Sequence, residues 1–156
     1  MQRKVLLFPT YEQALFYRKS HAQANSAGIL NISVETPYTW LKDAWERFGD
    51  GTKLVSSLER AFIVKYLIQS AKGTEIASAL APTEGVISFV SRFFADVVGS
   101  EEYSHALTSQ SESFSKAEQL LLSLIDPYRD LLKERGLIEQ GDALSILSKR
   151  SLPFSF

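Results

Sequence analysis

The sequence contains no cysteine among its 156 residues. This absence excludes disulfide bonds, thiol catalysis and thiolate metal sites, and it fits a protein of the reducing cytoplasm. His21 and His105 are the only imidazoles, and no carboxylate pattern accompanies either of them. The sequence therefore predicts neither a metal site nor a serine–histidine–acid triad.

Long apolar runs are also lacking. A membrane span needs about 20 apolar residues, and no segment of the sequence approaches that length. The short apolar run at 5–8 is not followed by the cleavage site of a signal peptide. We therefore expect no membrane contact and a cytoplasmic location. The motif Gly-x-x-x-x-Gly-Lys-Ser/Thr is missing as well, so we expect no cradle for nucleotide phosphates, no catalytic residue and no cofactor in this chain.

What the chain does contain is an ordinary globular composition, with 45% apolar and 12% aromatic residues. A chain of this length can bury one substantial core, so global disorder is excluded. The formal net charge is −1, which argues neither for nor against nucleic acid as a partner.

The first fifty residues predict a strand–helix–strand unit followed by a helix. The apolar run at 5–8 predicts a buried strand, Thr10 and Gln13 have the spacing of a helix-capping pair, and Gly28 is expected to stop that helix after Ala27. A second strand is expected at 29–34, parallel and adjacent to the first. Two strands do not complete a parallel sheet, so the missing strands would come from outside this chain or from partner chains.

After residue 52 no further strand is predicted. Capping boxes at Ser56–Glu59 and Ser115–Glu118 predict helix starts, and Pro82-Thr83 predicts another. A Ser-rich stretch at 100–116 is interpreted as a loop or a short frayed helix. One long amphipathic helix, kinked at Pro127 and ended by Gly136, is expected next, and then a last helix at 141–150.

The predicted organisation has three parts. Residues 1–51 form a small α/β part and residues 52–150 a helical part. The apolar end at 151–156 is the start of a strand in a truncated chain, or a tail that folds back on its own core.

Two short motifs follow the predicted strands: Phe-Pro-Thr-Tyr-Glu-Gln-Ala at 8–14 and Thr-Pro-Tyr-Thr at 36–39. UvrD/Rep-type superfamily 1 helicases have Thr-Phe-Thr-Asn-Lys-Ala-Ala and Thr-Phe-His-Ser at the corresponding places, and Thr10, Ala14 and Thr36 are identical. Tyr128, Gly-Leu-Ile-Glu at 136–139 and Asp-Ala-Leu at 142–144 are similar to the segment that closes their helical insertion. The order of elements most closely resembles the N-terminal helicase-like region of the B subunit of AddAB-type helicase–nucleases.

This resemblance implies a fold and a function. The fold would be α/β and predominantly helical: a short parallel strand pair with a crossover helix, as in part of a P-loop NTPase core, plus an inserted helical subdomain. The function would be non-catalytic, either engaging single-stranded DNA or scaffolding a partner subunit in double-strand-break repair and recombination. The resemblance implies DNA-binding residues at two kinds of position. Thr10, Tyr11, Thr36 and Tyr38 lie in the two motifs, and Arg18 and Lys19 lie on the helix after the first motif.

Two other functions stay open at this stage. The chain could be a helical protein-interaction module without a nucleic-acid role. It could also belong to an active ATPase whose phosphate loop lies outside this chain. Thr10 and Thr36 could equally be ordinary helix caps, and Tyr38 could simply pack.

For three further sets of residues, the sequence pattern favours a structural role. Asp126, Asp130 and Glu134 recur every four residues, which is more typical of a solvated helix face than of a metal site. Helical spacing favours a core position over a base-stacking platform for Phe89, Phe93 and Phe94. Of Trp40 and Trp45, which are five residues apart, one is expected in the core and the other at an interface.

Overall fold

The computed structural model describes residues 4–24, 32–71, 76, 80–98 and 114–150. The chain divides into two compact units, Met1–Arg47 and Phe48–Phe156. The described part is predominantly helical, as the sequence predicts. It contains no helix with the length and apolarity that a membrane crossing requires.

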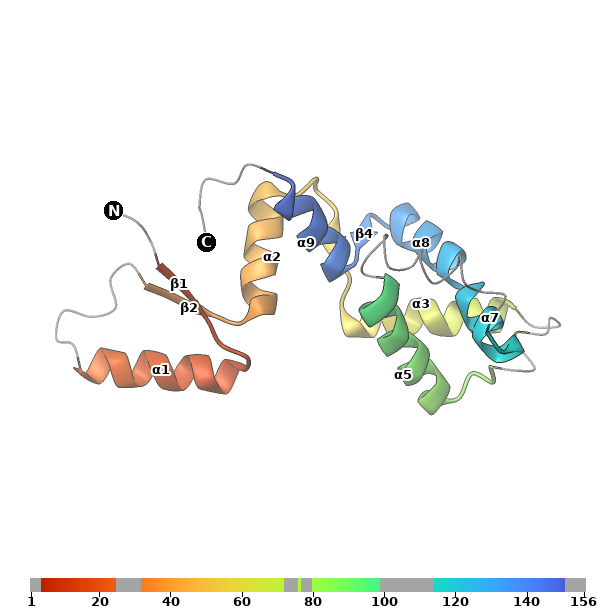
Figure 1. The fold of residues 1–156 in the computed structure, drawn as a ribbon, viewed down its shortest axis with the longest axis horizontal. Helices are drawn as coiled ribbons and strands as arrows, with labels where there is room; N and C mark the ends of the chain where they lie inside the picture. Colours follow the sequence, from red (N-terminus) through yellow and green to blue (C-terminus); the bar gives the residue numbers. More distant parts are fainter. Residues whose placement is uncertain (1–3, 25–31, 72–75, 77–79, 99–113, 151–156) are drawn as a thin grey trace. The chain divides into compact units, whose positions relative to one another are not determined.

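The elements are shown in Figure 1. In chain order they are β1 (Lys4–Leu7), α1 (Tyr11–Ala24), β2 (Ile32–Glu35), α2 (Pro37–Phe48), β3 (Lys53–Leu54), α3 (Ser57–Ser70), α5 (Glu84–Phe93), the π-helix η1 (Phe94–Val98), α7 (Lys116–Leu122), α8 (Ile125–Glu134), β4 (Leu137–Ile138) and α9 (Gln140–Ser148).

Strands β1 and β2 form a parallel pair, which confirms the prediction for the first unit. The register places Lys4 opposite Ile32 and Leu7 opposite Glu35. Helix α1 is the crossover between the two strands. The predicted helix end at Ala27 and Gly28 and the predicted strand start at 29–31 lie outside the described residues, as does most of the Ser-rich stretch at 100–116.

A second parallel pair, β3 with β4, corrects the prediction that no strand follows residue 52. Lys53 lies opposite Leu137 and Leu54 opposite Ile138. Each strand is two residues long, so neither produces the alternating pattern by which strands are recognised. The pair joins two segments that are far apart in the sequence.

The helix starts of the second unit follow the predicted capping chemistry. At Ser56 the side chain accepts from the amide of Glu59, and the Glu59 carboxylate accepts from the amide of Ser56. Ser115 and Glu118 form the same reciprocal pair at α7. Both capping boxes are therefore confirmed.

The long amphipathic helix predicted after Ser115 is wrong in one respect, because the structure has two helices there. Helix α7 ends at Leu122 and α8 begins at Ile125, so the break precedes Pro127 instead of lying at it. Pro127 is the third residue of α8. A proline in the first turn removes an N–H that has no intrahelical partner, so the helix begins there without bending. Gly136 ends the segment at a positive φ of 63°, as predicted.

One cluster of buried side chains forms the core of the second unit, and α3, α5, α7 and α8 all contribute to it. Its members are Val55, Ile63, Val64, Leu67, Ile68, Val90, Phe94, Leu121, Leu122, Leu124, Ile125, Tyr128 and Leu132.

The expectation that the three phenylalanines of α5 and η1 are core residues holds only in part. Phe94 is fully buried and Phe93 packs against the cluster, whereas Phe89 is 63% exposed. Phe89 therefore lies on the solvent-exposed side of α5. Trp45 is buried and Trp40 half-buried, so Trp45 is the core residue of that pair.

Candidate functional site

The first candidate site is the edge of the β1–β2 pair where both strands end. The amide of Phe8 donates to the carbonyl of Glu35 (2.8 Å), so the segments after the two strands leave from the same end. Helices α1 and α2 begin there, as Figure 1 shows. In open parallel sheets, ligands bind outside the carboxyl ends of the strands.

The two threonines that the resemblance assigns to DNA binding are helix caps. The Thr10 hydroxyl accepts from the amide of Gln13 at 3.3 Å. Thr36 and Thr39 cap each other, since the Thr36 amide donates to the Thr39 hydroxyl at 2.9 Å and the Thr39 amide donates to the Thr36 hydroxyl at 3.2 Å. Both hydroxyls accept hydrogen bonds from the backbone, so further ligand contacts at this edge would come from other groups.

Those other groups are the two tyrosines of the first helical turns. Tyr11 is 61% exposed and Tyr38 is 44% exposed. Tyr11 directly follows the cap Thr10, and Tyr38 lies two residues after the cap Thr36. The carboxylates of Glu12 and Glu35 belong to the same edge, so aromatic stacking is better suited to this site than phosphate charge.

The two cations implied by the resemblance lie further along α1 than Tyr11. The Arg18 guanidinium donates to the backbone carbonyl of Val34, two residues before Thr36. Lys19 lies eight residues beyond Tyr11, which is about 12 Å along the axis of α1. Of the six residues implied by the resemblance, Thr10, Tyr11, Thr36 and Tyr38 therefore lie at the two helix starts, Arg18 contacts the end of β2 beside them, and Lys19 lies apart.

A second cluster of interacting polar side chains lies inside the helical unit. Arg60 of α3 donates two hydrogen bonds to the Glu139 carboxylate, from Nε to Oε1 at 2.7 Å and from Nη2 to Oε2 at 2.6 Å. The Tyr128 hydroxyl of α8 donates to Oε1 of Glu139 at 2.5 Å. Glu139 stands immediately before α9, so the cluster links α3, α8 and α9.

Burial and charge act together in this cluster. Glu139 is 1% exposed, Arg60 is 7% exposed and Tyr128 is fully buried. Burial by itself lowers the pKa of Arg60, but the hydrogen bonds and the charge of Glu139 outweigh it and raise that pKa. Burial, together with the Glu139 charge, also raises the pKa of Tyr128, so its hydroxyl remains a donor. The groups satisfy one another away from solvent, which is the arrangement of a structural link and leaves no room for a substrate.

Sequence reasoning did not find this cluster, although one signal was present. Arg60 precedes Ile63, Val64 and Leu67 by three, four and seven residues, which puts a charge on the apolar face of α3. A charge at such a position is expected to be paired. Its partner is 79 positions away, and no local pattern identifies it.

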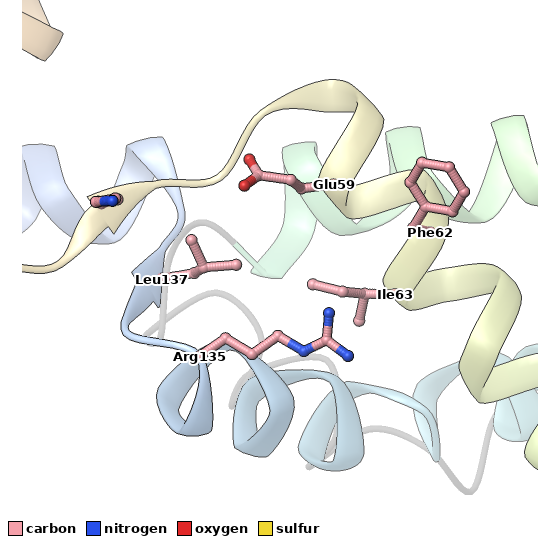
Figure 2. Close-up of a pocket in the computed structure, with 6 residues that line it drawn as sticks. Glu59, Phe62, Ile63, Arg135 and Leu137 are labelled. Carbon is pink, nitrogen blue, oxygen red and sulfur yellow. The ribbon is translucent and has the colours of Figure 1, made fainter.

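An open pocket of about 520 Å³ lies beside the β3–β4 pair. Figure 2 shows Glu59, Phe62 and Ile63 from α3 on one side and Arg135 and Leu137, which follow α8, on the other. Lys53 completes the lining. The pocket thus combines two cations with an exposed aromatic ring.

The recurring carboxylates of α8 do not form a site. Asp126, Asp130 and Glu134 are all exposed. Within the described residues, no three histidine, cysteine, aspartate or glutamate side chains are grouped in a way that could hold a metal ion.

Comparisons with protein-family models, with curated proteins and with solved structures found no match to this chain.

Proposed function

We propose that the carboxyl edge of the β1–β2 pair binds single-stranded DNA, and that the chain serves as a non-catalytic module of a cytoplasmic helicase–nuclease in double-strand-break repair and recombination. The observation that carries this proposal is the pairing of two exposed tyrosines, Tyr11 and Tyr38, with two helix starts at one edge of a parallel strand pair.

The chemistry of that edge suits an unpaired strand. An exposed tyrosine can stack on a base, which contributes about 1–3 kcal/mol for each base. The first turn of a helix carries backbone N–H groups without intrahelical partners, and these can donate to phosphate oxygens. Because Thr10 and Thr36 hold the two helix starts in place, their role would be to position the tyrosines rather than to contact the strand.

The proposal is tested by fluorescence anisotropy with a labelled oligothymidylate. Tyr38→Ala is expected to weaken binding about tenfold, the loss of one stacked base. Because Tyr38 is exposed, the melting temperature should stay nearly unchanged. Glu12 and Glu35 oppose phosphate attraction, so the salt dependence should be shallow and correspond to few phosphate contacts.

Phe16→Ala is the matched control. Phe16 is 74% exposed on the same helix as Tyr11 but lies more than one turn away from the edge. Absence of binding at low salt would contradict the proposal. An equal loss of binding in the Phe16 and Tyr38 variants would do the same, because it would show that any exposed aromatic serves.

A further inference from the structure

Helix α3 is apolar on two opposite faces. One face packs into the core through Ile63, Val64 and Leu67. The other carries Leu58, Phe62 and Tyr66, which are 66%, 60% and 54% exposed. We name these three exposed side chains the α3 stripe. A helix that covers only one core needs one apolar face, so the second face lies outside the core that the described residues form.

The spacing of the α3 stripe is that of a helix-recognition surface. Residues four apart along a helix are neighbours, so the three side chains form a continuous row about 12 Å long. Apolar rows with this spacing are how helices dock along one another. Two of the three are aromatic, and aromatic side chains contribute much of the binding energy of protein interfaces.

The pocket beside the β3–β4 pair, which we call the cationic pocket, adjoins the α3 stripe, because Phe62 belongs to both. Lys53 and Arg135 line the pocket, and no ion pair within the described residues engages either of them. The third charge, Glu59, already accepts a hydrogen bond from the amide of Ser56 at 2.9 Å. The pocket therefore offers two cations outside any ion pair of the described residues, next to an apolar row.

We propose that the α3 stripe and its cationic pocket dock an acidic amphipathic helix of a partner protein. The apolar side chains of that helix would lie on Leu58, Phe62 and Tyr66. A carboxylate at its edge would enter the pocket, where the Arg135 guanidinium can donate two parallel hydrogen bonds to it.

A nucleic acid fits this surface less well. A phosphate backbone needs a row of cations, whereas the cations here lie at one place beside the carboxylate of Glu59. The aliphatic Leu58 also provides no ring for a base to stack on. The inference is independent of the DNA proposal, since it involves residues of the second unit alone.

The experiment uses the full chain and two fluorescein-labelled helical peptides of about 18 residues, long enough to span the stripe. Both peptides carry leucines at i, i+4 and i+8. One has glutamates beside the leucines, and the other has lysines in the same places. Anisotropy should show micromolar binding of the glutamate peptide and at least tenfold weaker binding of the lysine peptide.

Three variants locate the binding surface. Phe62→Ala should weaken the glutamate peptide at least tenfold without lowering the melting temperature. Arg135→Glu should reduce or reverse the preference between the two peptides. Phe89→Ala is the matched control, because Phe89 is 63% exposed on α5 and lies outside the stripe, so binding should not change.

Several results would overturn the inference. These are failure of the glutamate peptide to bind, equal binding of the two peptides, and equal effects of the Phe62 and Phe89 variants. Sedimentation equilibrium that shows self-association abolished by Phe62→Ala would assign the stripe to a second copy of the chain. Competition by single-stranded DNA that depends on Phe62 would assign it to nucleic acid.

Discussion

The two units of this chain differ in how large a buried core each forms from its own residues. The helical unit has one continuous cluster of buried side chains, and the Arg60–Glu139 pair links its helices. In the first unit, the apolar β1 residues Val5 and Leu7 remain 41% and 44% exposed, while Val34 of β2 is 2% exposed. The helical unit therefore forms a substantial core of its own, although the α3 stripe lies exposed on its surface, whereas in the α/β unit apolar side chains of the strand pair itself stay exposed.

The reason lies in the strand pair. Parallel strands normally have both faces buried, and their sequences are correspondingly apolar throughout. β1 has such a sequence, yet β2 is its only partner among the described residues. The stability of the first unit should therefore depend more on partners and on solution conditions than the stability of the second unit does.

The unfolding of the two units can be followed separately with two spectroscopic probes. Both tryptophans, Trp40 and Trp45, lie in the first unit, so tryptophan fluorescence follows that unit. Most of the helices lie in the second unit, so far-ultraviolet circular dichroism mainly follows that one. For the unsubstituted protein we expect two separate unfolding transitions in urea. The transition followed by circular dichroism should lie at the higher urea concentration.

The largest expected effect comes from breaking the buried pair. Glu139→Ala leaves the Arg60 charge and the Tyr128 hydroxyl without their partner inside the core. Removing one member of a buried ion pair costs about 3–5 kcal/mol. The dichroism transition should move to much lower urea, and the fluorescence transition should not move.

A double variant distinguishes loss of the pair from loss of packing. Arg60→Leu with Glu139→Leu removes both charges, and replacing a buried ion pair with apolar residues is often close to neutral. The double variant should therefore be more stable than Glu139→Ala alone. If the two are equally unstable, the cost in Glu139→Ala comes from something other than the unpaired arginine.

Much of what stabilises the helical unit could be predicted from the sequence, and the buried pair could not. The capping boxes at Ser56 and Ser115 are local, since each needs only residues three apart, and both are confirmed. The β1–β2 pair follows from an apolar run, a helix pattern and a second run in order. Arg60 lies on the apolar face of α3, which indicates a partner without identifying it, and Glu139 is 79 positions away in the sequence.

The candidate sites show the same limit. Sequence motifs located Thr10 and Thr36 but could not show that their hydroxyls serve as caps, because capping and ligand binding use the same residue types. Phe89 and Phe62 have helical apolar spacing and are nevertheless exposed. Periodicity identifies apolar faces, but it does not say which face meets a neighbouring helix.

A medium loss of stability is expected from a substitution in β2, and a substitution in the adjacent strand β1 is the matched control. Val34→Ala removes two methyl groups from a buried site, which should cost about 2 kcal/mol when the residual cavity is included. Val5→Ala changes a side chain that is 41% exposed and should cost less than about 0.5 kcal/mol. Val34→Ala should move the fluorescence transition alone. A shift of the dichroism transition by the same amount would show that the units unfold together.

A smaller effect is expected from the caps of the helical unit. Ser115→Ala removes the side-chain acceptor that satisfies the amide of Glu118 at the start of α7. Losing such a cap costs about 1 kcal/mol. Ser145→Ala, at an exposed position within α9, is the control. The dichroism transition should shift to lower urea in the first variant and should not do so in the second.

The smallest effect is a pH dependence of the helical unit that arises at Glu59. Hydrogen bonds from the Ser56 side chain and amide hold the pKa of the Glu59 carboxyl below its usual value of 4.5. A carboxyl with a lowered pKa in the folded state contributes stability that is present above the unfolded pKa and is lost as the pH falls through the folded value. The urea midpoint of the dichroism transition should therefore decrease below about pH 4.5. Glu59→Gln should flatten this decrease, and Ser56→Ala should flatten it too, since it removes the largest cause of the shift. An unchanged slope in both variants would mean that other carboxyls produce the acid sensitivity.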